Sequence, residues 1–287
     1  MNSGVLIFDV DNTLYDFVDF FGPSFRSMMH AICRTEHIAE ADFIEGARKV
    51  YQKAGSLEYQ FLIQNMELFS DLSDDEQQRL VRLARVAFSK TRNSRLSLYP
   101  GMLELIVSAR ASGYKCVCVT NAPYYEVSGR LRDLRMLDLI DGLVAWEGRG
   151  VEESRIEHVR KYSDRRAHLT QRLQMFHVAH YDDLKPSSAP FVLIAERFGC
   201  VSRCFSIGDS LAKDLDPAKA IGMHTIWARY GTRVQEHNLR TLLDVTPWLP
   251  EHIALATQET SEPDFVADSP RDIARVLQIP IQGDLFA

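Results

Sequence analysis

The chain has 287 residues, of which 46% are hydrophobic and 25% are charged, and its net charge at pH 7 is −6. This composition is typical of a globular protein with one large or two modest domains, and the acidic balance disfavours nucleic-acid binding as the main task. No apolar run approaches the roughly 18 residues needed to cross a membrane. The N-terminus has no basic segment followed by an apolar core, so we expect a cytoplasmic protein without a signal peptide or a membrane partner.

Two aspartates follow the first predicted element, an apolar strand over residues 5–8. Side chains alternate along a strand with a period of two, so Asp9 and Asp11 tend to project the same way where the strand ends. Two neighbouring carboxylates repel each other. The arrangement makes sense if one of them binds a cation and attacks a substrate while the other carries a proton.

Residues 16–95 are predicted to be wholly helical. Apolar side chains recur at helical spacing from Phe17 to Ile32, and a capping box at residues 73–76 begins a later helix. From Tyr99 onward the pattern changes to alternating strands and helices. Strands are expected at 115–119, 142–146, 203–207 and 224–228, and helices at 101–113, 124–136, 187–198, 211–220 and 270–277.

This alternation predicts a mostly parallel sheet with helices on both faces. The fold class is therefore α/β, with a Rossmann-like, doubly wound parallel sheet as the core. Residues 1–15 and 96–287 form that core, and residues 16–95 form an all-helical cap domain inserted after the first strand.

The five cysteines indicate reduced thiols, because their number is odd and their density is low. Cys116 and Cys118 alternate with valines in an expected strand, and we interpret them as small buried hydrophobic side chains. Cys200 and Cys204 flank a short loop, and no second pair offers a zinc site.

Active sites of open parallel sheets form at the carboxyl ends of the strands, so further reactive residues are expected there. Thr120 and Asn121 follow one strand, where a hydroxyl and backbone N–H groups can hold phosphate oxygens. Asp209 and Asp214 follow another strand. The structural alternatives are a turn or helix cap for the first pair and stabilisation of a helix start for the second.

Lys185 precedes a predicted helix and lies 24 residues before Asp209. A solvated lysine is the ordinary alternative. The four aspartates at the strand ends could not share one pocket without compensation, and Mg²⁺ together with Lys185 would supply the missing positive charge.

These stretches together resemble the four signatures of the haloacid dehalogenase-like (HAD) hydrolases. The first is Asp-x-Asp-x-Thr at residues 9–13, the second is Thr120, and the third is Lys185 before a helix. The strongest match is the fourth, the run over residues 208–223. The resemblance covers residues 1–15 and about 96–228. It implies the phosphatase branch with a helical cap, because dehalogenases of the superfamily lack an acid at the position of Asp11.

The resemblance also implies a role for each site residue. Asp9 would attack phosphorus and form an aspartyl-phosphate, and Asp11 would protonate the leaving oxygen and then activate water. Thr120 and the backbone of Asn121 would hold phosphate oxygens, and Lys185 would neutralise charge. Mg²⁺ would be bound by the carboxylates of Asp9 and Asp209 and the carbonyl of Asp11, with Asp214 behind them.

Three regions fit the resemblance less closely. Residues 148–176 are expected to form an extra helical insertion, either a solvated amphipathic helix or an anion- or partner-binding element, which makes Lys161 a rival to Lys185. His177 and His180 have helical spacing but no acidic third ligand, so we expect a structural role. Residues 229–262 would form a lid, a packing arm or an oligomer contact.

Substrate choice is expected in the cap, which would close over the core and exclude water. The candidate substrate contacts are Tyr15, Phe17 and Lys53, with hinge and cap packing as the alternative for the two aromatic residues. The runs 11–15 and 51–56 resemble pyrimidine 5′-nucleotidase-type relatives. A nucleoside 5′-monophosphate is therefore one substrate class, and sugar phosphates and phosphoglycolate stay open.

The sequence thus predicts a Mg²⁺-dependent phosphatase that acts on a small phosphorylated metabolite through an aspartyl-phosphate intermediate. A phosphomutase of the same superfamily would share every core residue and would need a bisphosphate activator. A catalytically silent binding protein is the third alternative, and the intact set of core residues argues against it. The oligomeric state does not follow from the sequence.

Overall fold

The computed structural model describes residues 4–59, 61–146, 174–178, 181–198, 201–246 and 261–281. The chain divides into two compact units. The sheet unit comprises residues 1–15, 97–233 and 254–287, and the helical unit comprises residues 16–96 and 234–253.

The described residues of the sheet unit form seven parallel strands in the order β4-β3-β2-β1-β5-β6-β7. The strands are β1 (Val5–Phe8), β2 (Lys115–Pro123), β3 (Gly142–Trp146), β4 (Gln174–Val178), β5 (Cys204–Gly208), β6 (His224–Ala228) and β7 (Phe265–Ala267). The order reverses at β1, because the chain adds β2, β3 and β4 on one side of it and β5, β6 and β7 on the other. The predicted doubly wound α/β core is confirmed.

The central position of β1 explains its sequence. All four residues of β1 are buried, since the strand pairs with β2 on one side and β5 on the other and is covered on both faces. A strand buried on both faces reads as a continuous apolar run and not as an alternating one. Cys116 and Cys118 of β2 are completely buried, as predicted for small hydrophobic side chains.

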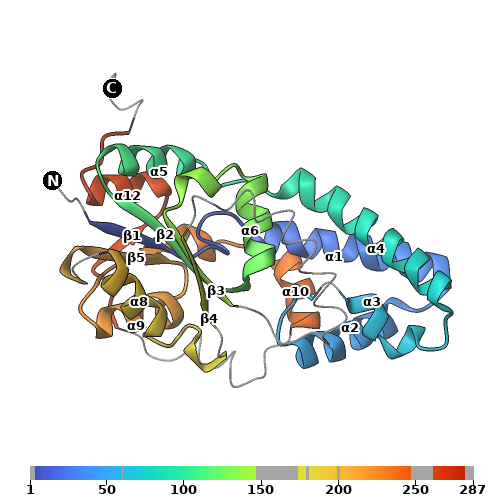
Figure 1. Cartoon of the computed structure of the whole chain (residues 1–287). Coiled ribbons are helices and arrows are strands. Elements are labelled where there is room, and N and C mark those ends of the chain that lie inside the picture. Colours follow the sequence, from blue (N-terminus) through green and yellow to red (C-terminus); the bar gives the residue numbers. More distant parts are fainter. Residues whose placement is uncertain are drawn as a thin grey trace. The chain divides into compact units, whose positions relative to one another are not determined.

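Helices cover both faces of this sheet. Figure 1 shows α5 (Met102–Ala111) and α12 (Pro270–Val276) on one face and α8 (Ala189–Phe198) and α9 (Asp216–Ala220) on the other. Side chains of the last two helices, such as Phe191 and Ala218, form a buried core with Val5 and Ile7. The helix α6 (Tyr124–Asp133) follows β2 and is shorter than predicted, ending before residue 136.

The structure also corrects several sequence predictions. Residues 211–215 form a π-helical turn that leads into α9, where one continuous helix was expected. The strands β4 and β7 were not predicted, and β4 takes residues 174–176 out of the expected helical insertion. His177 lies in the strand β4 and not in a helix. The rest of the expected insertion, His180, Lys161 and Cys200 lie outside the described residues.

The helical unit contains α1 (Phe17–Glu36), α2 (Glu40–Ala54), α3 (Leu62–Asn65), a 3₁₀ turn at Glu67–Phe69, α4 (Asp74–Arg95) and α10 (Glu236–Val245). The predicted apolar stripe of α1 is buried, and Phe17, Phe21 and Phe25 stack in sequence along it. The predicted capping box begins α4, where the Ser73 N–H donates to Glu76 Oε2 at 2.9 Å. None of the described helices is long and apolar enough to cross a membrane.

The membership of α10 in the helical unit differs from the sequence assignment, which gave all of residues 96–287 to the core. Arg26 on α1 donates to Asn238 Oδ1 at 2.7 Å and to Thr241 Oγ1 at 2.6 Å, and Asn238 Nδ2 donates to Asp19 Oδ1 at 3.0 Å. A Cβ at Gly22 would lie only 3.0 Å from the Asn238 carbonyl oxygen, so this glycine allows the two helices to approach closely. The part of residues 229–262 that forms α10 therefore packs on α1.

Candidate active site

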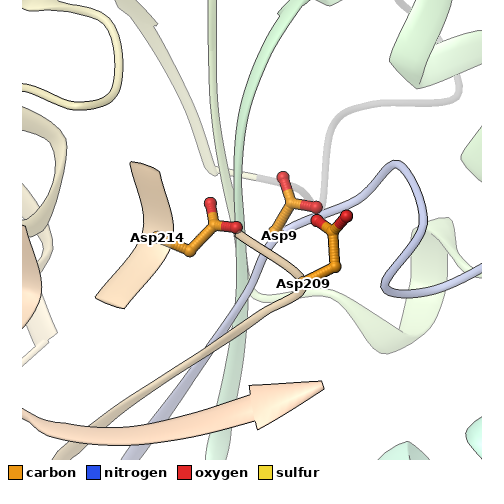
Figure 2. A group of neighbouring side chains, drawn as sticks. All are labelled: Asp9, Asp209 and Asp214. Carbon is orange, nitrogen blue, oxygen red and sulfur yellow. The ribbon is translucent and has the colours of Figure 1, made fainter. Parts of the chain in front are cut away.

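Three aspartates gather at the carboxyl ends of the central strands, as Figure 2 shows. Asp9 directly follows β1, and its N–H donates to the carbonyl oxygen of Ile207 in β5 at 2.8 Å. Asp209 directly follows β5, and Asp214 lies on the π-helical turn after it. One carboxylate oxygen from each of the three lies within 4.8 Å of the others. Hard oxygen donors at this spacing are ligands that suit Mg²⁺.

The ammonium group of Lys185 lies among these carboxylates. Its Nζ donates to Asp9 Oδ1 at 2.5 Å, to Asp214 Oδ1 at 2.6 Å and to the carbonyl oxygen of Val119 at 3.0 Å. The side chain is only 4% exposed. An ammonium group has three protons to donate, and these three acceptors use all of them. The lysine is therefore fixed in position and is not a solvated surface residue.

The charges in this group are not balanced. Burial raises the pKa of Asp9 to about 7, the negative charges of Asp214 and Asp11 add to the increase, and the Lys185 ammonium opposes it. Burial, Asp9 and Asp214 also raise the pKa of Asp209 well above its ordinary value. Burial alone would lower the pKa of Lys185, but the charges of Asp214 and Asp9 raise it above its usual value. A bound divalent cation would neutralise the excess negative charge.

The position of Asp214 depends on a glycine. Its Oδ2 accepts a hydrogen bond from the Ser210 N–H at 3.0 Å, and its backbone oxygen accepts one from Ser206 Oγ at 2.7 Å. A Cβ at Gly208 would lie 2.4 Å from Asp214 Oδ2, inside van der Waals contact. The glycine in the fourth signature is therefore required because the carboxylate occupies the space of a side chain there.

The strand that carries Thr120 and Asn121 does not end at Val119, as the sequence predicted. The strand β2 continues to Pro123, and its register with β3 shifts between Val119 and Pro123. Thr120, which is 3% exposed, accepts a hydrogen bond from the Ala122 N–H at 3.1 Å. An irregularity of this kind re-aims side chains at a strand end. The Asn121 side chain binds the backbone of Lys185, with hydrogen bonds of 2.7 and 3.0 Å.

The turn after Asp9 is held by residues that follow β6. Asn12 has a left-handed backbone with a φ of 58°. A Cβ at Gly231 would lie 1.8 Å from the carbonyl oxygen of Asn12, so only glycine permits this approach. The Tyr230 hydroxyl donates to the carbonyl oxygen of Thr13 at 2.9 Å. These residues were not predicted, because their contacts join segments more than 200 positions apart.

A second buried cation lies beside Asp11. Arg130 on α6 is 1% exposed, and its Nη2 lies 3.4 Å from Asp11 Oδ1. The Tyr15 hydroxyl donates to the same oxygen at 2.6 Å. Burial raises the pKa of Tyr15 well above its ordinary value, and although Arg130 opposes this increase the phenol remains a hydrogen-bond donor. In the sequence, Arg130 lies between the apolar residues Val127 and Leu131 of the same predicted helix. Both of these residues are completely buried on α6 in the structure.

The remaining predicted substrate contacts belong to the helical unit. Phe17 is 9% exposed and stacks on Phe21, with ring centroids 5.4 Å apart. Lys53 is exposed in the last turn of α2. Phe17 thus packs within the helical unit, and the roles of Phe17 and Lys53 in substrate binding stay predictions.

The sheet with a helical unit inserted after its first strand, together with a buried lysine and acids at the strand ends, defines a hydrolase class. A family model described as haloacid dehalogenase-like hydrolase matches residues 4–222, and a second described as HAD-hydrolase-like matches residues 184–273. The chain belongs to the haloacid dehalogenase-like hydrolases. The predicted superfamily, and with it the hydrolase class, is confirmed.

Three similar proteins illustrate the family. A glyceraldehyde 3-phosphate phosphatase of Methanopyrus kandleri is 24% identical over 281 residues, which cover 95% of this chain and 96% of the relative. The structure of a 2-haloacid dehalogenase from Pseudomonas syringae pv. Tomato DC3000 has a TM-score of 0.58 at 14% identity, covering 96% of this chain and 98% of that one. A HAD phosphatase from Thermococcus onnurineus has a TM-score of 0.53 at 17% identity, with 97% and 99% covered.

Proposed function

We propose that the protein is a Mg²⁺-dependent phosphatase that hydrolyses a small phosphorylated metabolite through an aspartyl-phosphate intermediate on Asp9. The observation that carries this proposal is the buried contact between Lys185 Nζ and both Asp9 and Asp214, with Asp209 beside them. A fold without a reaction to perform would avoid three carboxylates so close to one another beside a buried ammonium group.

The residues divide the chemistry between them. A carboxylate oxygen of Asp9 attacks phosphorus, the bond from phosphorus to the leaving oxygen breaks, and Asp11 gives its proton to that oxygen. Asp11 then takes a proton from the water that attacks the aspartyl-phosphate. The products are inorganic phosphate and free Asp9, so atoms and charges balance over the cycle. Thr120 and the Asn121 N–H hold phosphate oxygens during both steps.

The metal ligands in this proposal are the carboxylates of Asp9 and Asp209 and the carbonyl oxygen of Asp11, with Asp214 supporting them. A bound Mg²⁺ offsets the repulsion between the Asp9 carboxylate and an anionic phosphate. Lys185 contributes to the same compensation from its buried position, and its three hydrogen bonds keep the Asp9 carboxylate in one orientation.

The substrate in this proposal is a small phosphate monoester. The Methanopyrus relative is described as a glyceraldehyde 3-phosphate phosphatase, which makes triose phosphates the first class to test. The nucleotide alternative loses part of its support, because Tyr51 in the run that suggested it is 3% exposed and packs on Phe25. Tyr15 is completely buried and its hydroxyl is hydrogen-bonded to Asp11. In this proposal Tyr15 therefore holds Asp11 and does not contact the substrate directly.

The test is phosphate release from a panel that contains glyceraldehyde 3-phosphate, phosphoglycolate, sugar phosphates, nucleoside 5′-monophosphates and 4-nitrophenyl phosphate. Each substrate is assayed with Mg²⁺ and with EDTA, for the natural chain, for Asp9→Asn and for Asp138→Asn. Asp138 is an exposed residue of the sheet unit, so its variant controls for the loss of one charge.

Release that requires both Mg²⁺ and Asp9, and that survives in Asp138→Asn, supports the proposal. Turnover of a sugar phosphate only after addition of a bisphosphate activator would indicate a phosphomutase. No release from any substrate, together with no binding of beryllium fluoride as an aspartyl-phosphate mimic, would overturn the proposal in favour of a binding protein.

A further inference from the structure

Arg130 is a buried cation that the reaction scheme above does not use. It lies on α6 between Val127 and Leu131, which are completely buried, and its own side chain is 1% exposed. Burial of a guanidinium group is costly, and a hydrophobic residue of similar size serves a core at least as well. Such low exposure also argues against direct contact with a substrate. The position of Arg130 therefore requires an explanation other than packing.

The contacts of Arg130 lead to Asp11. Its Nη2 lies 3.4 Å from Asp11 Oδ1, and its guanidinium carbon lies 5.6 Å from the centre of the Tyr15 ring. The Tyr15 hydroxyl donates to that same Oδ1 at 2.6 Å. One carboxylate oxygen thus faces a cation and a hydrogen-bond donor, and these two groups also contact each other.

Tyr15 itself is held by the backbone of the sheet unit. It forms isolated bridges with Asp11 and with Leu98, and its side chain is completely buried. A donor that is fixed in this way restricts the rotation of the carboxylate that accepts its hydrogen bond. Because both contacts are made to Oδ1, the orientation of the Asp11 carboxylate is set from one side.

We propose that Arg130 is a positioning residue that acts with Tyr15 to orient the carboxyl group of Asp11. In this orientation, Asp11 gives its proton to the leaving oxygen. This inference rests on the proposed function, because it concerns the step in which the bond from phosphorus to that oxygen breaks. Neither Arg130 nor Tyr15 contacts the substrate in this scheme. Both oxygens of Asp11 are needed, Oδ1 for the two contacts and Oδ2 for the transferred proton.

The proposal has a consequence that a structural role does not share. A leaving group that departs readily as an anion needs little help from a general acid, and one that departs poorly needs it strongly. Misplacing Asp11 should therefore slow bond cleavage in phenyl phosphate much more than in 4-nitrophenyl phosphate. A general change in folding or in the phosphate site would slow both esters alike.

The experiment uses the full chain with Mg²⁺ and measures phenol release in a single turnover, which reports bond cleavage before the aspartyl-phosphate is hydrolysed. The variants are Arg130→Met, Arg130→Lys, Tyr15→Phe and Asp11→Asn. Arg132→Met is the matched control, because Arg132 lies on the same helix, is one-third exposed and pairs with Asp133. The melting temperature of each variant is measured in parallel.

We expect Arg130→Met and Tyr15→Phe to lose about 10- to 100-fold in the cleavage of phenyl phosphate, which is part of the roughly 100- to 10,000-fold that general acid catalysis supplies. The loss with 4-nitrophenyl phosphate should be several-fold smaller and KM little changed. Arg130→Lys retains the cation and should recover part of the rate. Combining Arg130→Met with Asp11→Asn should add no further loss, because the group being positioned is already absent.

Equal losses for both esters, or a loss in Arg132→Met as large as in Arg130→Met, would overturn the inference while leaving the phosphatase assignment intact. If Arg130→Met fails to fold, Tyr15→Phe decides, because it removes one hydroxyl and keeps the ring. If the natural chain releases neither phenol nor 4-nitrophenol and also fails the substrate panel and the beryllium fluoride test, the proposed function itself fails, and that result differs from all of the others.

Discussion

The side chain of Asn121 and the backbone of Lys185 form a reciprocal pair of hydrogen bonds. Asn121 Nδ2 donates to the Lys185 carbonyl oxygen at 2.7 Å, and the Lys185 N–H donates to Asn121 Oδ1 at 3.0 Å. The loop that carries the lysine is thereby attached to β2, the strand that also carries Thr120. The side chain of Asn121 thus links the second family signature, at Thr120, to the third, at Lys185.

Replacement of Asn121 by alanine should therefore displace Lys185. Both backbone groups of Lys185 lose their partners, and we expect a loss of about 1–3 kcal/mol of stability, measured by urea unfolding. We expect kcat for phosphate release to fall as well. Asn93→Ala on an exposed turn of α4 is the control and should change neither quantity. Unchanged stability and kcat in Asn121→Ala would contradict this coupling.

Replacement of Asp9 by asparagine should abolish turnover without weakening the fold. Asp9 lies among like charges and its pKa is raised to about 7, so the neutral amide removes a repulsion. Lys185 retains Asp214 and the Val119 carbonyl as acceptors. Without Mg²⁺ at pH 8 we expect a melting temperature equal to or a few degrees above that of the natural chain. Substantial residual phosphate release would refute Asp9 as the nucleophile.

Replacement of Lys185 by methionine should be strongly destabilising. The variant leaves the carboxylates of Asp9 and Asp214 without their cation, and breaking a buried ion pair from one side costs about 3–5 kcal/mol. Lowering the pH should recover part of that loss, because the carboxylates then become neutral. The control is Lys115→Met, since the Lys115 side chain is 56% exposed and pairs with Asp141 at the surface. We expect that control to cost less than about 1 kcal/mol.

The stability of the metal-free protein should decrease as the pH rises from about 4 to about 7. The pKa of Asp9 is raised from 3.8 to about 7 and that of Asp209 is raised in the same direction, so the folded state holds more protons than the unfolded chain in this window. Lys185, whose pKa is raised, loses its contribution only at strongly alkaline pH.

Mg²⁺ should reverse this trend, because it binds the deprotonated carboxylates. Melting temperatures measured in EDTA and in Mg²⁺ across that pH range test both statements. Asp9→Asn should flatten the decrease seen in EDTA. Stabilisation by Mg²⁺ that is as large at pH 4 as at pH 7 would argue against metal binding by these carboxylates.

Replacement of Gly231 by alanine should disturb the candidate active site, although Gly231 belongs to none of the four family signatures. The added Cβ would lie 1.8 Å from the carbonyl oxygen of Asn12 and 3.0 Å from Asp209 Cβ, so the turn after Asp9 must shift. We expect several kcal/mol of destabilisation and a loss of activity. Gly46→Ala in α2 is the control, because its nearest neighbour is the flexible end of Met66. That variant should be neutral or slightly stabilising.

The parts of the site that could be predicted from the sequence are those encoded locally. Asp9, Asp209 and Thr120 directly follow apolar runs, and the parallel sheet brings such strand ends together without further information. Lys185 was identified only through the family resemblance. Its burial depends on Asn121 and on the carboxylates, which are distant in the sequence.

The missed elements lack a local signal for equally physical reasons. The strand β7 has only three residues, so its apolar run is too short to indicate a strand. The helix α10 has a clear apolar face, but hydrophobic periodicity does not identify the element that covers that face. In the structure this element is α1, to which Asn238 of α10 is hydrogen-bonded. Arg130 was overlooked because a helical arginine is normally exposed.

The strand order also determines when the chain can fold during its synthesis. Asp9, the proposed nucleophile, follows β1, which precedes the other described strands in the sequence. One of the two neighbours of β1 is nevertheless β5, which ends at Gly208. The helical unit is completed later still, because α10 ends at Val245. A nascent chain therefore carries the apolar β1 segment unpaired on one side until β5 has been translated. Such late pairing slows folding and prolongs the time during which the emerging chain depends on protection from aggregation.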